Sequence, residues 1–306
     1  RNFEGLSSRK KGPIKVLVGP WLHGHFTVER TFAGDIEFGE ESALESFRDL
    51  HKRWFDAALM GADTGIEDEA PVEIFVMGGG SGERTAAGRL FHGGRWRQEN
   101  EWPLARTEFT PFYLHGDGGL APSPPDETDS STTYRFDPSN PVPSVGGNVS
   151  ALCDLLPSPT GVMDPAFTPR DGRIETMLTP GGYNQVEGPQ FWGCTPPYLP
   201  LGSRPDVLVF ETEPLEQDVE VTGPIEVFLW VTSSAVDTDF TAKLIDVYPP
   251  SSWYPFGYAL NLTDSIMRLR FRNGYEHGGE LLTPGDRVRV QITLYPTSNL
   301  FVAGHR

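Results

Sequence analysis

Hydrophobic and polar positions alternate most clearly in two segments near the carboxyl end of the chain. Within residues 266–271 and 288–294, apolar side chains alternate with polar ones, most of which are arginines. An alternation with a period of two is typical of half-buried antiparallel strands. Shorter apolar runs between turn-forming residues predict further strands at residues 112–115, 133–136, 207–211, 225–232 and 240–247. With no convincing helical period between them, residues 110–306 are predicted to form a β-sandwich of jelly-roll type.

The amino-terminal third has a different pattern. Residues 16–18 are consecutively apolar, which favours a strand buried on both faces, as in a parallel sheet. Residues 71–77 form a second apolar strand segment, which ends in three glycines. Between them, apolar positions recur every three or four residues over residues 42–60. This spacing predicts a helix with one apolar face, which places Trp54 and Phe55 in or near the core.

A strand, a helix and a second strand in this order indicate the closing βαβ unit of a doubly wound sheet. The chain of 306 residues is long enough for two domains, and its 28 prolines and 34 glycines favour loops and strands over a helical bundle. The predicted fold class is therefore α/β plus all-β. The predicted domains are residues 1–109 and residues 110–306. The boundary lies near Thr110, where the mixed pattern of helix and strand gives way to short alternating strands.

Charge and apolar content exclude several classes of partner. The net charge of −17 would repel nucleic acid and anionic membranes, so neither is expected as a partner. No apolar run reaches about 18 residues, so no membrane-spanning helix is expected. Cytoplasmic and secreted locations both stay open, and so does a homo-oligomer. The two cysteines, Cys153 and Cys194, lack metal-ligand spacing; a disulfide between them is one alternative, and two free thiols are the commoner one.

His23 is the candidate catalytic residue. Gly19 and Pro20 end the first predicted strand, because proline cannot donate to a sheet ladder, and His23 follows in the loop. The loop lies beyond the carboxyl end of the strand, where ligands bind in open α/β sheets. On spacing alone, a structural or solvated histidine is the commoner interpretation.

Residues 18–24 (VGPWLHG) resemble the segment that carries the catalytic histidine in the CocE/NonD family of serine hydrolases. The family includes cocaine esterase, α-amino-acid ester hydrolases, glutaryl acylases and relatives of X-Pro dipeptidyl-peptidase. The resemblance continues in order through residues 88–97, 101–104, 204–210, 220–224, 233–244, 297–299 and 304–306. It implies the final segment of an α/β-hydrolase domain followed by most of a jelly-roll domain, because family members continue past the last motif with further strands.

The same resemblance implies a serine hydrolase that cleaves a small ester or amide through an acyl-serine intermediate, with no cofactor and no metal. His23 would be its general base. In α/β-hydrolases the nucleophile and the acid precede the histidine along the chain. Residues 1–22 contain no aspartate and no Gly-x-Ser-x-Gly. Both partners are therefore expected upstream of Arg1, and the chain is expected to be a carboxyl-terminal fragment that is inactive alone.

The remaining candidate residues are expected to be structural. Ser81 is expected in a turn, and Asp35 and Asp63 in solvated loops. His25 is expected to shape the loop that carries His23, and His51, His92 and His277 are expected at the surface. Asp237 and Asp239 could bind calcium, but a turn that hydrogen-bonds its own backbone is the favoured interpretation.

The alternative function, from a different class, is a non-catalytic β-sandwich that binds carbohydrate or another protein. Its aromatic platform would consist of Trp192, Trp230 and Trp253, the three tryptophans of the predicted sandwich. Trp230 stands in an apolar strand and is expected to be buried, which weighs against this alternative.

Overall fold

The computed structural model describes residues 2–7, 9, 12–23, 27–127, 130–148 and 178–306. This part of the chain is mostly β-structure with few helices. Its strands are β1 (Val16–Val18), β2 (Phe32–Ala33), β3 (Ile36–Glu37), β4 (Val72–Gly78), β5 (Leu90–Phe91), β6 (Gly94–Glu99), β7 (Tyr113–Leu114), β8 (Leu120–Ala121), β9 (Val219–Val231), β10 (Asp239–Tyr248), β11 (Tyr258–Arg268) and β12 (Val288–Phe301). Its α-helices are α1 (Asn2–Ser7) and α2 (Phe47–Met60), with short 3-10 turns η2 (Glu40–Ser42), η5 (Leu201–Ser203), η6 (Leu269–Phe271) and η7 (Tyr275–His277). Among these helices none is both long and apolar enough to cross a bilayer.

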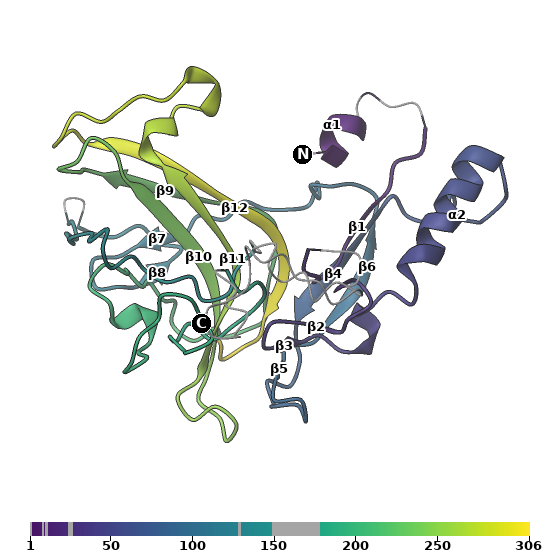
Figure 1. Cartoon of the computed structure of the whole chain (residues 1–306), viewed down its shortest axis with the longest axis horizontal. Helices are drawn as coiled ribbons and strands as arrows, with labels where there is room; N and C mark the ends of the chain where they lie inside the picture. Colours follow the sequence, from purple (N-terminus) through teal and green to yellow (C-terminus); the bar gives the residue numbers. More distant parts are fainter. Residues whose placement is uncertain (1, 8, 10–11, 24–26, 128–129, 149–177) are drawn as a thin grey trace, which may run out of the picture.

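One mixed sheet runs through both halves of the described chain, in the order β1-β4-β12-β9 with β6 also paired to β4 (Figure 1). β6 pairs antiparallel with β4 along residues 72–77, which fills one edge of β4. A strand has only two edges, so β1 and the end of β12 share the other edge. β1 pairs in parallel with residues 72–74, and β12 pairs in parallel with Met77 and Gly78.

The change of partner along β4 follows from local sequence. β1 ends at Val18, before Gly19 and Pro20, and Asn299 and Leu300 of β12 then pair with the end of β4. Gly78 makes this approach possible: its φ is 91°, and a Cβ there would lie 2.2 Å from the carbonyl oxygen of Leu300.

β1 is less buried than its sequence predicts. Val16 and Leu17 are half-buried, and Val18 is 48% exposed, so the prediction of a strand buried on both faces is wrong. The reason is its position: β1 is the edge strand of the described sheet, with β4 as its neighbour there.

Helix α2 lies between β1 and β4 along the chain, after β2, β3 and η2, and β1 and β4 are parallel, which confirms the predicted order of strand, helix and parallel strand. It begins at Phe47, later than predicted, because Ser46 caps it by accepting a hydrogen bond from the Asp49 amide. Gly61 ends it in the left-handed conformation. Its apolar face is not covered: no residue of α2 is buried and Phe55 is 51% exposed, so the prediction that Phe55 lies in or near the core is wrong.

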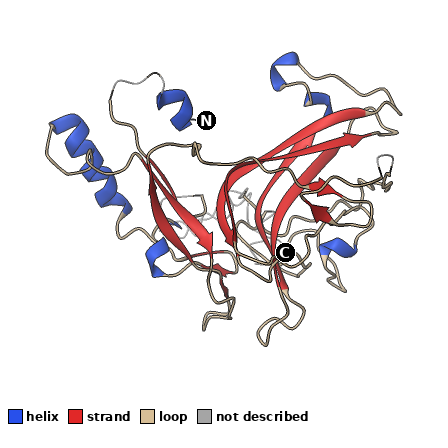
Figure 2. Cartoon of the chain, turned by 180° about the vertical axis from the view of Figure 1, so that it is seen from behind, coloured by secondary structure: helices blue, strands red, loops and turns tan. Residues whose placement is uncertain are grey.

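The carboxyl-terminal strands form two packed layers, one from β9 and β12 and one from the β10–β11 hairpin (Figure 2). The inner side chains of β9 and β12 face those of β10 and β11. The core between the layers is formed by the buried residues Leu269, Leu282, Val290, Ile292 and Leu294. The alternation predicted for residues 288–294 is thus confirmed, with Val290, Ile292 and Leu294 inside and polar side chains outside.

Other strand predictions for this half are wrong. Residues 133–136 form no strand, and in residues 207–211 only Glu211 makes a bridge, to Gly119. The strand predicted at 266–271 ends at Arg268, because the chain then turns into η6. Trp230, expected to be buried, is 64% exposed, since it lies on the outer face of edge strand β9.

A second core joins segments from both predicted domains. Its buried members from the amino-terminal part are Ala33, Ile36, Phe38, Phe75 and Leu90, and those from the carboxyl-terminal part are Tyr248, Tyr258 and Leu260. The two parts therefore share buried apolar surface. The division at residues 1–109 and 110–306 stays a prediction.

Candidate active site

The structure places His23 on an exposed loop just beyond the carboxyl end of β1. Its side chain lines a surface cavity of about 400 Å³. The other lining residues are Leu17, Val18, Gly19, Trp21, Leu22, Val28 and Phe47. The cavity wall is thus mostly apolar and comes from β1, the loop that follows it and the first residue of α2.

The chain before His23 is held by Trp21. The Trp21 indole N–H donates to the carbonyl oxygen of Ser42 at 2.8 Å, and its ring packs against Trp96 in a tilted arrangement, with 5.6 Å between ring centroids. The Trp96 indole N–H donates to the neighbouring carbonyl of Glu41 at 2.6 Å. Gly19 is required for this fold-back, since a Cβ there would lie 2.5 Å from the Trp21 ring. The Gly-Pro-Trp motif therefore has a structural explanation.

The chain after His23 is held by Thr27 and by the start of α2. The buried Thr27 hydroxyl donates to the carbonyl oxygen of Leu22 at 2.6 Å. The Val28 carbonyl accepts from the Leu44 amide at 2.7 Å, and the Glu29 carboxylate accepts from the Phe47 amide at 3.1 Å. A carboxylate at the amino end of a helix is also favoured by the helix dipole.

No serine or acidic residue is among the described residues that line the cavity with His23. Ser81 caps a turn by accepting from the Glu83 amide, as predicted, and Asp35 and Asp63 are exposed loop residues, as predicted. His25 lies outside the described residues, as does Cys153, so its pairing with Cys194 is not described.

The Asp237 and Asp239 carboxylates bind arginines instead of closing a local turn, so that prediction is wrong. Asp237 accepts from the amide and the guanidinium of Arg270, and Asp239 forms a bidentate pair with Arg268. No group of three or more potential metal ligands occurs in the part of the chain that the structure describes.

His92 does not lie at the surface, as its glycine-rich sequence predicts, but is fully buried. Its Nε2 donates to Oδ1 of Asn299 at 2.7 Å, and its Nδ1 accepts from the Tyr248 hydroxyl at 2.5 Å. Asp246 extends the group, because it accepts from Asn299 and from Nδ1 of His305 at 2.8 Å. The predicted surface positions of His51 and His277 are confirmed.

Burial lowers the pKa of His92 below the ordinary value of 6.5, and the charge of His305 acts in the same direction. Asp246 and the hydrogen bond to Asn299 oppose this effect without cancelling it. Neutral His92 fits its partners, since one ring nitrogen can donate to the Asn299 amide oxygen while the other accepts from the Tyr248 hydroxyl. The group ties the β5–β6 loop to β10, to β12 and to the carboxyl-terminal turn, and it is separate from the residues lining the cavity.

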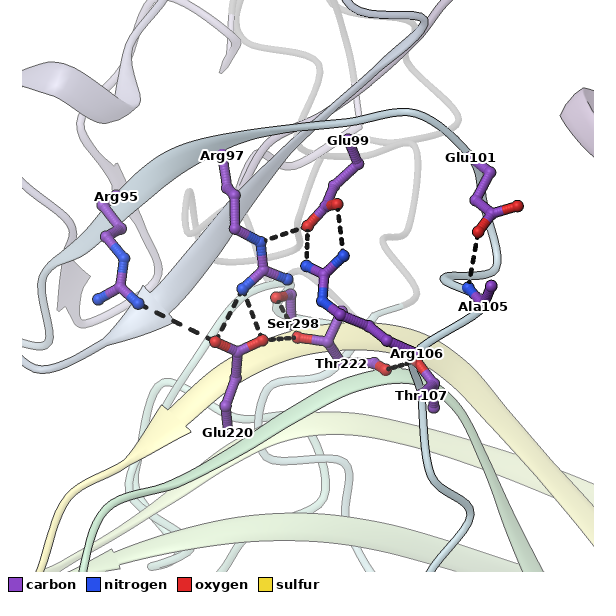
Figure 3. A network of polar contacts seen from close by, with 10 residues as sticks. All are labelled: Arg95, Arg97, Glu99, Glu101, Ala105, Arg106, Thr107, Glu220, Thr222 and Ser298. Carbon is purple, nitrogen blue, oxygen red and sulfur yellow. Dashed lines mark hydrogen bonds and ion pairs between the residues drawn. The ribbon is translucent and has the colours of Figure 1, made fainter.

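A second polar group connects β6 to β9 (Figure 3). The Arg97 guanidinium donates to both oxygens of Glu220 at 2.7 and 2.8 Å and lies 2.6 Å from Glu99. Hydrogen bonds from Arg106 lower the pKa of Glu99 against the effect of burial. Burial would raise the pKa of Glu220, but hydrogen bonds from Arg97 and Thr222, together with the charges of Arg97 and Arg95, lower that pKa overall.

Comparison with known proteins assigns the chain to a family. Residues 64–306 match the family described as X-Pro dipeptidyl-peptidase C-terminal non-catalytic domain. The chain is 34% identical to cocaine esterase from Rhodococcus sp. (strain MB1 Bresler) over 98% of its own length, but it spans 44% of the length of that relative.

Solved structures show the same relationship. An α-amino acid ester hydrolase superposes with a TM-score of 0.60 at 25% identity, covering 94% of this chain and 41% of the other. An aminopeptidase from a marine sediment Thaumarchaeota archaeon superposes with a TM-score of 0.62 at 21% identity, covering 99% of this chain and 43% of the other, which shows a common fold. The chain therefore belongs to the CocE/NonD and X-Pro dipeptidyl-peptidase family of hydrolases.

Proposed function

We propose that this chain is the carboxyl-terminal part of a serine hydrolase and supplies its general base, His23. In this proposal residues 1–109 complete an α/β-hydrolase domain and residues 110–306 form a jelly-roll domain. The nucleophilic serine and the triad aspartate come from chain that precedes residue 1. The substrate is a small ester or amide, cleaved through an acyl-serine intermediate.

The observation that carries the proposal is the place of His23. It is exposed, it follows the carboxyl end of a parallel strand, and it lines an open cavity with an apolar wall. A general base must reach the proton that it accepts, which a buried histidine such as His92 could not do. An apolar wall suits the acyl or leaving group of an ester.

In the proposed reaction the His23 imidazole takes the proton of the serine hydroxyl as the hydroxyl attacks the carbonyl carbon. It then returns that proton to the leaving alcohol or amine, so that the charge balances at each step. The aspartate holds the ring in one tautomer. Water attacks the acyl-serine in the second half of the reaction, again with His23 as the base.

The first prediction concerns His23→Ala in the full-length protein. We expect kcat for p-nitrophenyl butyrate hydrolysis to fall by about 10³-fold or more, since loss of a triad member costs several orders of magnitude. The melting temperature should barely change, because an exposed loop histidine contributes little packing. His277→Ala, which removes another exposed histidine, is the matched control and should keep the parental rate.

The 306-residue chain alone is assayed beside these variants. It should show no turnover above buffer, because positioned nucleophile and oxyanion groups supply the large rate effects. Turnover by the isolated chain at the parental rate would place the nucleophile within residues 1–306. A fully active His23→Ala variant would show that another group is the base.

One feature of β9 supports the alternative of a sugar-binding module, and another opposes it. Trp230 and Phe228 share the exposed face of β9, as a stacking platform requires. However, the Arg287 guanidinium lies over the Trp230 ring at 5.1 Å and Arg289 over the Phe228 ring at 4.4 Å. Each ring thus already has a cation on one face, so we do not advance this function.

A further inference from the structure

Within the described part of the chain, the His23 imidazole is exposed and has no hydrogen bond or ion pair. In the proposed enzyme the triad aspartate would orient the ring, while the backbone on either side of His23 sets where the ring lies. This matters for catalysis, because misplacing a reacting group by about 1 Å can cost about 10²-fold in rate.

We propose that Thr27 and Trp21 are positioning residues that hold His23 in place for proton transfer. The proposal rests on the proposed function of His23 as the base. It goes further by assigning a role in the reaction to two residues that would not touch the substrate's reacting atoms. They fix the loop on opposite sides of His23.

The Thr27 hydroxyl donates to the carbonyl of Leu22, the residue directly before His23, at 2.6 Å. This side-chain bond connects Thr27 with Leu22 and limits how far the carbonyl of Leu22 can turn. Thr27 is 4% exposed, so water cannot readily replace the bond. The anchored Leu22 side chain also packs against the core that contains Ile36 and Phe75.

Trp21 fixes the other end of the same short segment. Its indole N–H and the indole N–H of Trp96 bind two successive carbonyls of η2, those of Ser42 and Glu41. The two rings are in tilted contact, and Trp96 in turn packs edge-on against the buried Phe75 of β4. The two aromatic rings thus connect the segment that carries His23 to β4 of the sheet.

The test uses the full-length enzyme and ester hydrolysis over a range of pH. Thr27→Val keeps the shape of the side chain and removes the hydroxyl; Thr27→Ser keeps the hydroxyl. We expect Thr27→Val to lower kcat by about 10- to 100-fold at an unchanged KM, and Thr27→Ser to restore most of it. Trp21→Phe keeps an aromatic ring beside Trp96, loses the indole N–H, and should also lower kcat; because Trp21 lines the cavity as well, this variant is compared by kcat alone.

Thr263→Val is the matched control. Its buried hydroxyl also donates to a backbone carbonyl, that of Tyr295 at 2.9 Å, but within the β-sandwich. This variant should lose stability and keep kcat. If Thr27→Val does not fold, Trp21→Phe still tests the proposal through its kcat, compared with that of Thr263→Val.

The outcomes separate this proposal from the one before it. If His23→Ala is inactive while Thr27→Val and Trp21→Phe both keep the kcat of Thr263→Val, His23 is the base but its loop needs no such anchors, and the positioning proposal is overturned. Failure of Thr27→Ser to restore kcat would overturn it as well. If His23→Ala itself is active, the proposed function fails first.

Discussion

The buried ring of His92 makes specific hydrogen bonds that its glycine-rich sequence does not predict. Its two ring nitrogens have opposite roles, one donating to Asn299 and one accepting from Tyr248. Protonation would place a positive charge inside the protein, which burial disfavours. Burial therefore keeps the imidazole neutral, although Asp246 and the hydrogen bond to Asn299 favour the charged form.

The pH dependence of stability follows from this constraint. The folded state resists protonation at His92, whose pKa is lowered, whereas the unfolded chain binds the proton below about pH 6.5. The unfolded state thus binds more protons, so the free energy of unfolding should fall as the pH drops from 7 to 5, with a slope of at most about 1.4 kcal/mol per pH unit from this group. Urea titrations of the full-length protein at several pH values measure it.

His92→Gln should flatten this part of the pH profile, while His277→Gln, an exposed control, should leave the profile unchanged. Asp246, His305 and Tyr248 remain around the site in both variants. An unchanged slope in His92→Gln would mean that a group other than His92 is responsible.

At the residue scale, the sequence predicts environments only where neighbours in the chain decide them. Ser81 bonds two residues away, and its turn is predicted correctly. His92 bonds to residues 156 and 207 positions away, and no local pattern contains that information. The prediction for Trp230 fails for a related reason. An apolar strand is usually buried, but β9 lies at an edge of the sheet and leaves one face open.

Among the elements, the junction of β4 and β12 depends on one glycine. Gly78 has a positive φ, and the carbonyl of Leu300 occupies the space where a Cβ would lie. Any other residue would strain the backbone and push β12 away from β4. Because β12 brings Asn299 to His92, the two features are linked.

We expect Gly78→Ala to destabilise the full-length protein by about 2 to 4 kcal/mol, combining backbone strain with a contact that cannot relax. Gly61→Ala is the matched control: Gly61 also has a positive φ, 64°, but nothing lies within 4 Å of the added carbon. It should cost about 1 to 2 kcal/mol. Equal losses of unfolding free energy in urea would show that the approach of Leu300 adds no cost.

The elements that the sequence predicts well are those that need no distant partner to be recognised. The buried alternation of β12 and the capped helix α2 belong to this class. The apolar runs at residues 133–136 and 207–211 have strand composition, but they become strands only if a ladder partner is available. The cavity beside His23 is predictable only in part. The motif that carries His23 is local in sequence, whereas Val28 and Phe47, which also line the cavity, lie outside that motif.

On the scale of the whole molecule, the Arg97–Glu220 pair joins the two predicted domains in Figure 3. The pair lies between β6 and β9, and neither side chain is more than a third exposed. Thr222 and Glu99 complete its hydrogen bonds. Such a pair is sensitive to loss of one partner, which leaves the other charge half-buried and unsatisfied.

A double-mutant cycle with Arg97→Met and Glu220→Gln in the full-length protein measures this pair. We expect a coupling free energy of about 1 to 3 kcal/mol at pH 7. Because the pKa of Glu220 is lowered in the fold, the coupling should be lost as the pH falls below the ordinary glutamate value of 4.5. The exposed Lys52–Asp56 pair on α2 is the control, with an expected coupling of about 0.3 to 0.5 kcal/mol. Similar couplings for both pairs would refute a special role for the junction.

The position of β12 also has a consequence for biosynthesis. This strand is the last in the described chain, yet it lies in the middle of the sheet, between β4 and β9. A ribosome makes the chain from its amino end, so β4 and β9 emerge before the strand that joins them. Until then both keep unpaired backbone groups, which are templates for association with other chains. The central sheet can close only after synthesis has passed Phe301, and its contacts between distant residues slow that step.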